Sequence, residues 1–327
     1  EDRLGSTTHL AVMDADGLDG GTDTDTGKGW FEISSVELGA SEQSVGADFS
    51  EVSVTLNGVS PTLFGDLATG TDFSSVMIQA VDGKGAVVYE MRLSDVLVSG
   101  TSTSGTAGAV VSSISFAYDQ IGLITPNGDV GYDTSSQELV DPLAIATPTS
   151  DGGIDIGPGN VEQFYLLVDG FNGGSQDAGF EGWFAIDSVQ FSGAVHILNG
   201  VPVSDPDFSD VSVSMSGISP DLLAELATGD GVGSVRIAGV NASGDIIYDL
   251  RLGNANITGD SYNADNGQIS SSLAIGYTQV GLITPGSSFG YDEQAGVIDP
   301  TQINPVVGGT PPPAEARSAV SYFLWVD

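Results

Sequence analysis

"DFSEVSVTLNGVSPTLFGDLATG", from Asp48 to Gly70, recurs as "DFSDVSVSMSGISPDLLAELATG", from Asp207 to Gly229, at an offset of 159 residues. The same offset relates "YDQIGLITP", which begins at Tyr118, to "YTQVGLITP", which begins at Tyr277. Fixed-period similarity of this kind is the mark of a repeat protein. The chain of 327 residues therefore holds two diverged copies of one domain.

Working outward from this stretch, each copy runs from an opening strand to a "GYD" tail. The second copy opens with "FYLLVDG", and the first with the weaker "THLAVMDADG". We predict repeat 1 at residues 8–133, a linker at 134–163, repeat 2 at 164–292, a Gly/Pro-rich linker at 293–321, and an opening strand at 322–327. The composition of both linkers favours extended chain without regular structure.

The two copies differ by an insertion between their second and third strands. "GWFEISSVELGA", from Gly29, matches "GWFAIDSVQFSG", from Gly182, at an offset of only 153 residues. The second copy therefore carries six additional residues near "AVHILNGVPVSDP".

Alternating apolar and polar residues predict an all-β fold with one short helix in each repeat. "WFEISSVEL" and "FSEVSVTL" alternate at the strand period, "DGKG" at Asp82–Gly85 predicts a hairpin turn, and "VVSSISFAYDQIGLITP" predicts the last long strand. Ser60 and Pro61 predict the start of a helix, and Gly70 predicts its end. Ser219, Pro220 and Gly229 repeat these signals. We expect a β-barrel or sandwich with one helix packed against it.

The composition limits the partners of the chain. There are 44 Asp and Glu residues against 7 Lys and Arg residues, a formal net charge of −37. Such a field repels nucleic acid and anionic lipid, and we expect neither as a partner. No apolar run approaches the ~18 residues that a membrane span needs, so we predict no membrane insertion. The charge suits salty surroundings, specific binding of divalent cations, or both.

The sequence carries no pattern that predicts an enzyme. It has no cysteine, which excludes disulfides and thiol catalysis. The two histidines, His9 and His196, occupy unrelated places in the two copies, so a histidine site common to both repeats is excluded.

The order of the motifs resembles the Hcp-type tube protein of bacterial type VI secretion. The matching pieces are "YLLVDG", "GW" before a strand, "SP-x-L" with "ATG" ending a helix, a hairpin that contains tyrosine, and "LSDVLVSG" at Leu93–Gly100. The resemblance covers most of each copy. It implies tandem Hcp-like β-barrels, each with a flanking helix, whose subunits associate into six-membered rings that stack into a hollow tube, and it implies no enzymatic activity.

Tandem domains, acidity and Gly/Pro linkers depart from that family, so three functions stay open. We expect a structural subunit of an extracellular tube or filament whose partner is the chain itself. The alternatives are a type VI secretion tube component or exported tube-like cargo, which implies a cytoplasmic tube, and a calcium-dependent adhesin or matrix protein. Three tandem pairs would complete a six-membered ring.

One acidic loop is a candidate calcium site. Five aspartates crowd "DADGLDGGTDTDTG", namely Asp14, Asp16, Asp19, Asp23 and Asp25. Alternating carboxylates with Gly turns suit Ca²⁺, although the sixth position from Asp14 lacks the Gly of an EF-hand loop. The alternative is a solvated acidic loop, and no cofactor is required.

The last residues form a candidate assembly strand. Tyr322, Phe323, Leu324, Trp325 and Val326 repeat the opening strand of a copy. Exposing them would be costly. They open a third repeat in a longer polymer, or they are donated to a barrel of the next chain.

Overall fold

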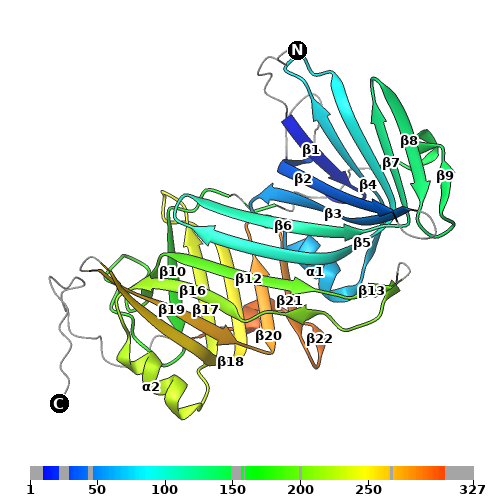
Figure 1. Ribbon diagram of the computed structural model, residues 1–327. Coiled ribbons are helices and arrows are strands. Elements are labelled where there is room, and N and C mark those ends of the chain that lie inside the picture. Colours follow the sequence, from blue (N-terminus) through cyan, green and yellow to red (C-terminus); the bar gives the residue numbers. More distant parts are fainter. Residues whose placement is uncertain are drawn as a thin grey trace. The chain divides into compact units, whose positions relative to one another are not determined.

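A computed structural model describes residues 10–21, 29–42, 47–148, 156–157, 159–198, 201–265 and 268–305. The chain divides into two compact units (Figure 1). Unit 1 comprises residues 1–102, 111–157 and 193–207, and unit 2 comprises residues 103–110, 158–192 and 208–327. Each unit thus takes one short segment from the other sequence repeat.

The first repeat forms a β-barrel, and the last three strands of the repeat extend one part of its sheet. Its elements are β1 (Leu10–Ala15), β2 (Phe31–Glu42), β3 (Ala47–Asn57), α1 (Pro61–Thr69), β4 (Asp72–Val81), β5 (Val87–Thr106), β6 (Ala109–Ala117), β7 (Gln120–Thr125), β8 (Gly128–Asp133), β9 (Glu138–Val140) and the 3₁₀ turn η1 (Pro142–Ala144). β1 lies between β2 and β4, and β3 joins β2 to β6. β7, β8 and β9 extend the sheet from β5.

The second repeat has the same order of pairing. Its elements are β10 (Gln163–Val168), β11 (Phe184–Ile186), β12 (Ser188–Ala194), β13 (Ile197–Leu198), β14 (Val201–Pro202), β15 (Asp207–Phe208), β16 (Val211–Ser216), α2 (Pro220–Thr228), β17 (Gly233–Val240), β18 (Ile246–Asp265), β19 (Gln268–Gly276), β20 (Gln279–Ile283), β21 (Ser288–Asp292), β22 (Gly296–Val297) and η2 (Pro300–Gln302). β10 pairs with β11 and β17, and β16 joins β12 to β19. The predicted fold class, tandem β-barrels with one short helix each, is confirmed. The inserted residues form the β13–β14 hairpin.

Both helices begin and end where the local sequence predicts. The Ser60 hydroxyl accepts a hydrogen bond from the Leu63 N–H at 3.0 Å, and Gly70 ends α1 at φ +66°. Ser219 and Gly229 do the same for α2, with Gly229 at φ +69°. A serine cap satisfies a free N–H in the first turn, and glycine takes the left-handed conformation without steric cost.

One long strand in each repeat bends at a residue in the left-handed region. Asp95 in β5 has φ +50°, and Asn254 in β18 has φ +49°. Asp and Asn tolerate this conformation better than other residues with a Cβ. Up to Ala255 β18 pairs with β17 and β20, and from Asn256 onward it pairs with β19. A single strand of 20 residues therefore serves two parts of the barrel.

Two expectations from the sequence are wrong in detail. The predicted last strand is broken at Tyr118 and Asp119, because the Asp119 N–H turns to bond the Ser94 carbonyl at 3.1 Å. Both predicted linkers also begin with regular structure, since β9 and η1 follow the first "GYD", and β22 and η2 follow the second. The physical reason lies in long-range hydrogen bonds that composition does not reveal.

The aspartates of the two "GYD" tails organise these turns. The Ser136 backbone N–H and the Gln120 side chain bond Asp133 at 2.7 and 2.8 Å and hold its pKa below the ordinary value. Asp292 receives the Gln279 amide at 2.7 Å and a backbone N–H from Ala295, and its pKa is lowered likewise.

None of the described helices is long and apolar enough to cross a membrane.

Candidate assembly surface

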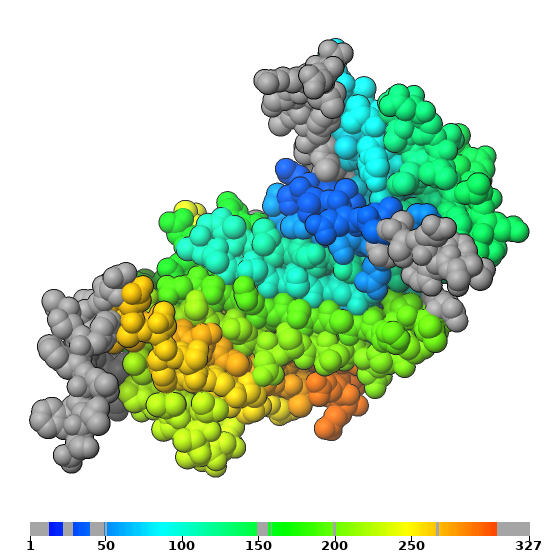
Figure 2. All heavy atoms as spheres, viewed as in Figure 1, coloured from blue at the N-terminus to red at the C-terminus, as the bar shows by residue number. Residues whose placement is uncertain are grey.

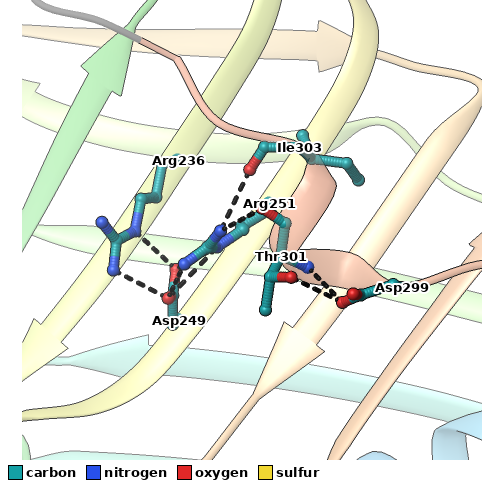
Figure 3. A network of polar contacts seen from close by, with 6 residues as sticks. All are labelled: Arg236, Asp249, Arg251, Asp299, Thr301 and Ile303. Atoms are coloured by element: carbon teal, nitrogen blue, oxygen red, sulfur yellow. Dashed lines mark hydrogen bonds and ion pairs between the residues drawn. The ribbon is translucent and has the colours of Figure 1, made fainter.

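An arginine fixes the segment that follows each barrel. Arg92, on β5, donates hydrogen bonds to the carbonyls of Leu143 and Ile145, each at 3.3 Å. Arg251, on β18, donates to the carbonyls of Thr301 and Ile303 at 3.3 and 3.2 Å (Figure 3). The start of each predicted linker is therefore held against its own barrel.

A carboxylate neighbours each of these arginines. Glu90 accepts from Arg92 at 2.6 Å in the first repeat. In the second, Asp249 bonds both Arg236 and Arg251, at 2.8 and 2.9 Å, and its side chain is only 6% exposed (Figure 3). One nearly buried carboxylate therefore compensates two guanidinium groups.

The outer half of β5, from Leu97 to Thr106, is covered by other segments within each of the two units. Within unit 1, the Val195 N–H donates to the Ser99 carbonyl at 2.9 Å. Within unit 2, a Cβ placed on Gly105 would lie 2.6 Å from Phe164 and 2.9 Å from Val189. Thr101 and Thr103 are 7% and 5% exposed.

The equivalent half of β18 has one edge without a strand partner among the described residues. From Asn256 to Asp265 this half pairs with β19 on one side only. Tyr262, which corresponds to the buried Thr103, is 38% exposed. We call this uncovered side, Asn256–Asp265, the β18 edge.

The hydrogen-bond pattern shows which residues of the β18 edge point outward. The Gly217 N–H bonds the Ile269 carbonyl, so residue 269 of β19 faces β16, and residues 268, 270, 272 and 274 face β18. Their register partners in β18 are residues 265, 263, 261 and 259. Because backbone groups alternate along a strand, the N–H and C=O groups of Asp260, Tyr262 and Ala264 point to the uncovered side.

The first repeat offers the complementary edge. Ser35–Leu38 of β2 pair with β3, and no second strand of the described part of the chain pairs with them. The corresponding part of β12 is the one whose Val189 lies against Gly105 in unit 2. We call Ser35–Leu38 the β2 edge.

The predicted calcium ligands are only partly described. Asp14 is buried at the end of β1, Asp16 accepts a hydrogen bond from the Ser74 hydroxyl, and Asp19 accepts the Gly21 N–H at 2.7 Å. Asp23 and Asp25 lie outside the described residues. Among the residues described, no three metal-binding side chains gather closely enough to hold an ion. The calcium site stays a prediction.

The predicted assembly strand, Tyr322–Val326, also lies outside the described residues. The position it would fill in a barrel is occupied in both repeats. β1 sits between β2 and β4, and β10 sits between β11 and β17. Neither described barrel has a vacancy for a donated strand, and the role of this segment stays a prediction.

Residues 12–123, which span most of the first repeat, match the family described as "Type VI secretion system effector, Hcp". The second repeat has the same elements in the same order. These are tandem Hcp-like domains. The Hcp family is a structural, non-enzymatic tube family, as the sequence predicted. Its members form homohexameric rings that stack into tubes and are secreted components of type VI secretion.

Solved Hcp structures align with a part of the chain about one repeat long. Hcp1 from Salmonella typhimurium is 16% identical, with a TM-score of 0.39, over 40% of this chain and 99% of its own. The secreted protein Hcp3 from Pseudomonas aeruginosa is 20% identical, with a TM-score of 0.31, over 40% and 97%. Hcp1 from Flavobacterium johnsoniae is 13% identical, with a TM-score of 0.31, over 39% and 98%. No curated protein matches the chain.

Sequence reasoning missed the β18 edge of the second Hcp-like domain. A signal was present, because the repeats diverge at this point. The outer half of β5 ends in "TSTSGT" at residues 101–106, whereas β18 ends in "DSYNAD" at residues 260–265. Small side chains suit the covered strand, and larger polar ones suit an exposed edge.

Proposed function

We propose that this chain is a structural subunit of a tube, in which the β18 edge of one copy pairs with the β2 edge of the next. The observation that carries the proposal is the difference between equivalent strands. The outer half of β5 is covered, whereas that of β18 is not. An uncovered strand edge is a template for pairing with another chain.

Side-chain sizes at the two edges support this pairing. In unit 2 the close neighbours of Gly105 are Phe164 and Val189. At the uncovered edge Ala264 takes the place of Gly105, and the register of β1 puts Ala11 in the place of Phe164. In the sequence, the larger residue of the β18 edge (Ala264 for Gly105) is thus accompanied by a smaller residue in the first repeat (Ala11 for Phe164), which supports the pairing.

Pairing of two different edges is head-to-tail association, which closes into a ring or continues as a filament. The Hcp family closes rings of six. Three copies of this chain would supply six barrels, so we propose a ring of three chains of 33.3 kDa each.

The family match favours a secreted tube component of the type VI kind over the extracellular filament that we placed first from the sequence. A permanent extracellular tube stays as the second candidate because of the net charge of −37. Such a charge suits an assembly that works in saline surroundings.

We predict that Tyr262→Pro weakens assembly without unfolding the barrel. Proline removes an N–H that points to the uncovered side, and it is tolerated on edge strands. One lost hydrogen bond contributes about 1 kcal/mol, and the ring of proline adds a clash with the incoming strand, so association should weaken by at least ~10-fold. Sedimentation velocity at a series of protein concentrations measures this.

Tyr262→Thr is the matched control, because it restores the residue type of Thr103 and keeps the N–H. It should assemble like the wild type. Circular dichroism melting verifies that both variants are folded. Rings formed equally well by Tyr262→Pro would refute pairing at the β18 edge.

Assembly should strengthen as salt rises. Every copy carries a net charge of −37, so copies repel one another until ions screen the charge. The Debye length falls from about 10 Å at 0.1 M to about 3 Å at 1 M. We expect light scattering to rise over this range in both sodium chloride and potassium chloride. Scattering that falls with salt would mean that specific ion pairs hold the copies together.

A further inference from the structure

The pairing of β5 with β12 supplies a pattern for the junction between two copies. Within unit 1, the Val195 N–H, just after β12, bonds the Ser99 carbonyl of β5 at 2.9 Å. Within unit 2, Val189 of β12 lies close to the Gly105 position of β5. Six residues separate the two positions on each strand, and the numbers rise along one strand as they fall along the other. β5 and β12 are therefore antiparallel and in a defined register.

The same register assigns the residues that face each other between two copies. Within unit 2 it places Ser104 opposite Gln190, since each is the neighbour of a residue of the close pair in that unit. The repeat offsets of 159 and 153 residues give Asn263 as the counterpart of Ser104 and Glu37 as the counterpart of Gln190. Both counterparts are exposed. Figure 2 shows atoms of β18 and β19, in yellow to amber, at the surface of unit 2.

We propose that Asn263 of one copy binds Glu37 of the next copy and thereby sets the register of the tube junction. The inference rests on the proposed function, because it names side chains that meet when the β18 edge pairs with the β2 edge. The amide of Asn263 donates hydrogen bonds, and the carboxylate of Glu37 accepts them. Facing residues of an antiparallel pair have Cβ atoms ~4.5–5.5 Å apart, which is within reach of such a bond.

The surroundings of Glu37 favour a donor on the incoming strand. Glu37 lines an open hollow at the surface of unit 1 together with Gly39, Glu51 and Ser53. Two carboxylates on one side of the sheet attract an N–H group and repel a third carboxylate. A neutral amide at position 263 therefore suits this place, although the chain as a whole is acidic.

A shifted register would bring conflicting groups together. In the inferred register, Asp265 at the end of the β18 edge falls opposite Ser35. A shift of two residues in one direction places Asp265 opposite Glu37, and like charges that face each other directly are destabilising. A shift of two residues in the other direction places Asp265 opposite Ile33, which is already paired with Ala11 of β1. The inferred register avoids both conflicts.

Cysteine cross-linking tests the register, because the chain has no cysteine of its own. Asn263 and Glu37 would form a pair whose backbone groups point away from each other, with Cα atoms ~4.5 Å apart, which suits a disulfide. We expect a chain with Asn263→Cys and Glu37→Cys, oxidised at high salt, to give a ladder of covalent oligomers on a non-reducing gel.

Two chains with shifted pairs are the matched controls for the cross-linking. One carries Asn263→Cys with Ser35→Cys, and the other carries Ser261→Cys with Glu37→Cys. In the inferred register these pairs lie on a diagonal ~7–8 Å apart, which is too far for a disulfide without movement of the backbone. We expect at least ~10-fold less cross-linked product from each of them.

A second measurement tests the recognition itself. Asn263→Asp should weaken association about 10-fold in sedimentation velocity, because a hydrogen bond is lost and like charges then face each other. Adding Glu37→Gln to the same chain should restore association, because the amide and the carboxylate then exchange strands. Ala242→Asp is the control, since it adds the same charge in an exposed turn, and it should associate like the wild type. Circular dichroism melting verifies that every variant is folded.

The outcomes separate the inference from the proposed function. Equal ladders from the matched pair and a shifted pair overturn the register and leave the pairing of the two edges intact. A loss of association in Asn263→Asp that Glu37→Gln does not relieve overturns the contact between the two side chains. A matched pair that cross-links only within one chain overturns a second copy as the partner. A wild-type chain that stays monomeric at every salt concentration overturns the tube and the register together.

Discussion

Phe64→Asp should unfold the first barrel, whereas Leu223→Asp at the equivalent position should leave the second barrel folded. Phe64 is 2% exposed and Leu223 is 43% exposed. Truncating a buried phenylalanine costs about 3–5 kcal/mol, and a buried carboxylate without a partner adds several more. The total is comparable with the ~5–15 kcal/mol that stabilises a typical domain. Leu223→Asp should cost less than about 1 kcal/mol in the monomer.

Urea unfolding of the two variants at low protein concentration measures this difference, because association is then negligible. Phe64→Leu is the control, since leucine is the residue of α2 at this position. It should cost about 1–2 kcal/mol, mainly through a small cavity. Equal destabilisation by Phe64→Asp and Leu223→Asp would mean that the two helix faces are covered alike in the monomer.

Asp249→Asn should destabilise the second barrel more than any other single polar substitution that we propose. It leaves Arg236 and Arg251 without their shared carboxylate at a site where the side chains are 20% and 11% exposed. Removing one partner of a buried ion pair costs about 3–5 kcal/mol. The freed Arg251 would also hold the Thr301 and Ile303 carbonyls less firmly, which loosens the start of the second linker.

Trp183 reports this transition, because its ring lies 5.6 Å from the Arg236 guanidinium. Its fluorescence should be read in a chain with Trp30→Phe and Trp325→Phe. Glu90→Gln is the matched control in the first repeat, where one arginine is left and Gln79 also contacts the carboxylate. It should cost clearly less than Asp249→Asn. An unchanged Trp183 transition in Asp249→Asn would show that the shared carboxylate does not stabilise the barrel.

The site was far less predictable than the fold. Asp260, Tyr262 and Ala264 have no motif, and their role depends on which side of β18 lacks a strand. Whether a strand lies at the edge or in the interior of a sheet is decided by its pairing with residues distant in the chain. The sequences of edge strands and interior strands overlap widely. The linker starts were misjudged for the same reason, because Arg92 and Arg251 act across about fifty residues of sequence.

The sequence by itself determined those features that residues close together in the chain form with one another. Ser60, Pro61 and Gly70 set the limits of α1, and "DGKG" made the turn before β5, because capping and turn formation involve groups within a few positions of one another. The repeat also predicted two copies of one fold. Only the tertiary structure decided that Phe64 is buried and Leu223 exposed, since burial depends on residues distant in the chain and similar local patterns do not fix it. Within unit 1, for example, Gly157 bonds Val59 just before α1, and Pro202 lies close to Gly70 just after it.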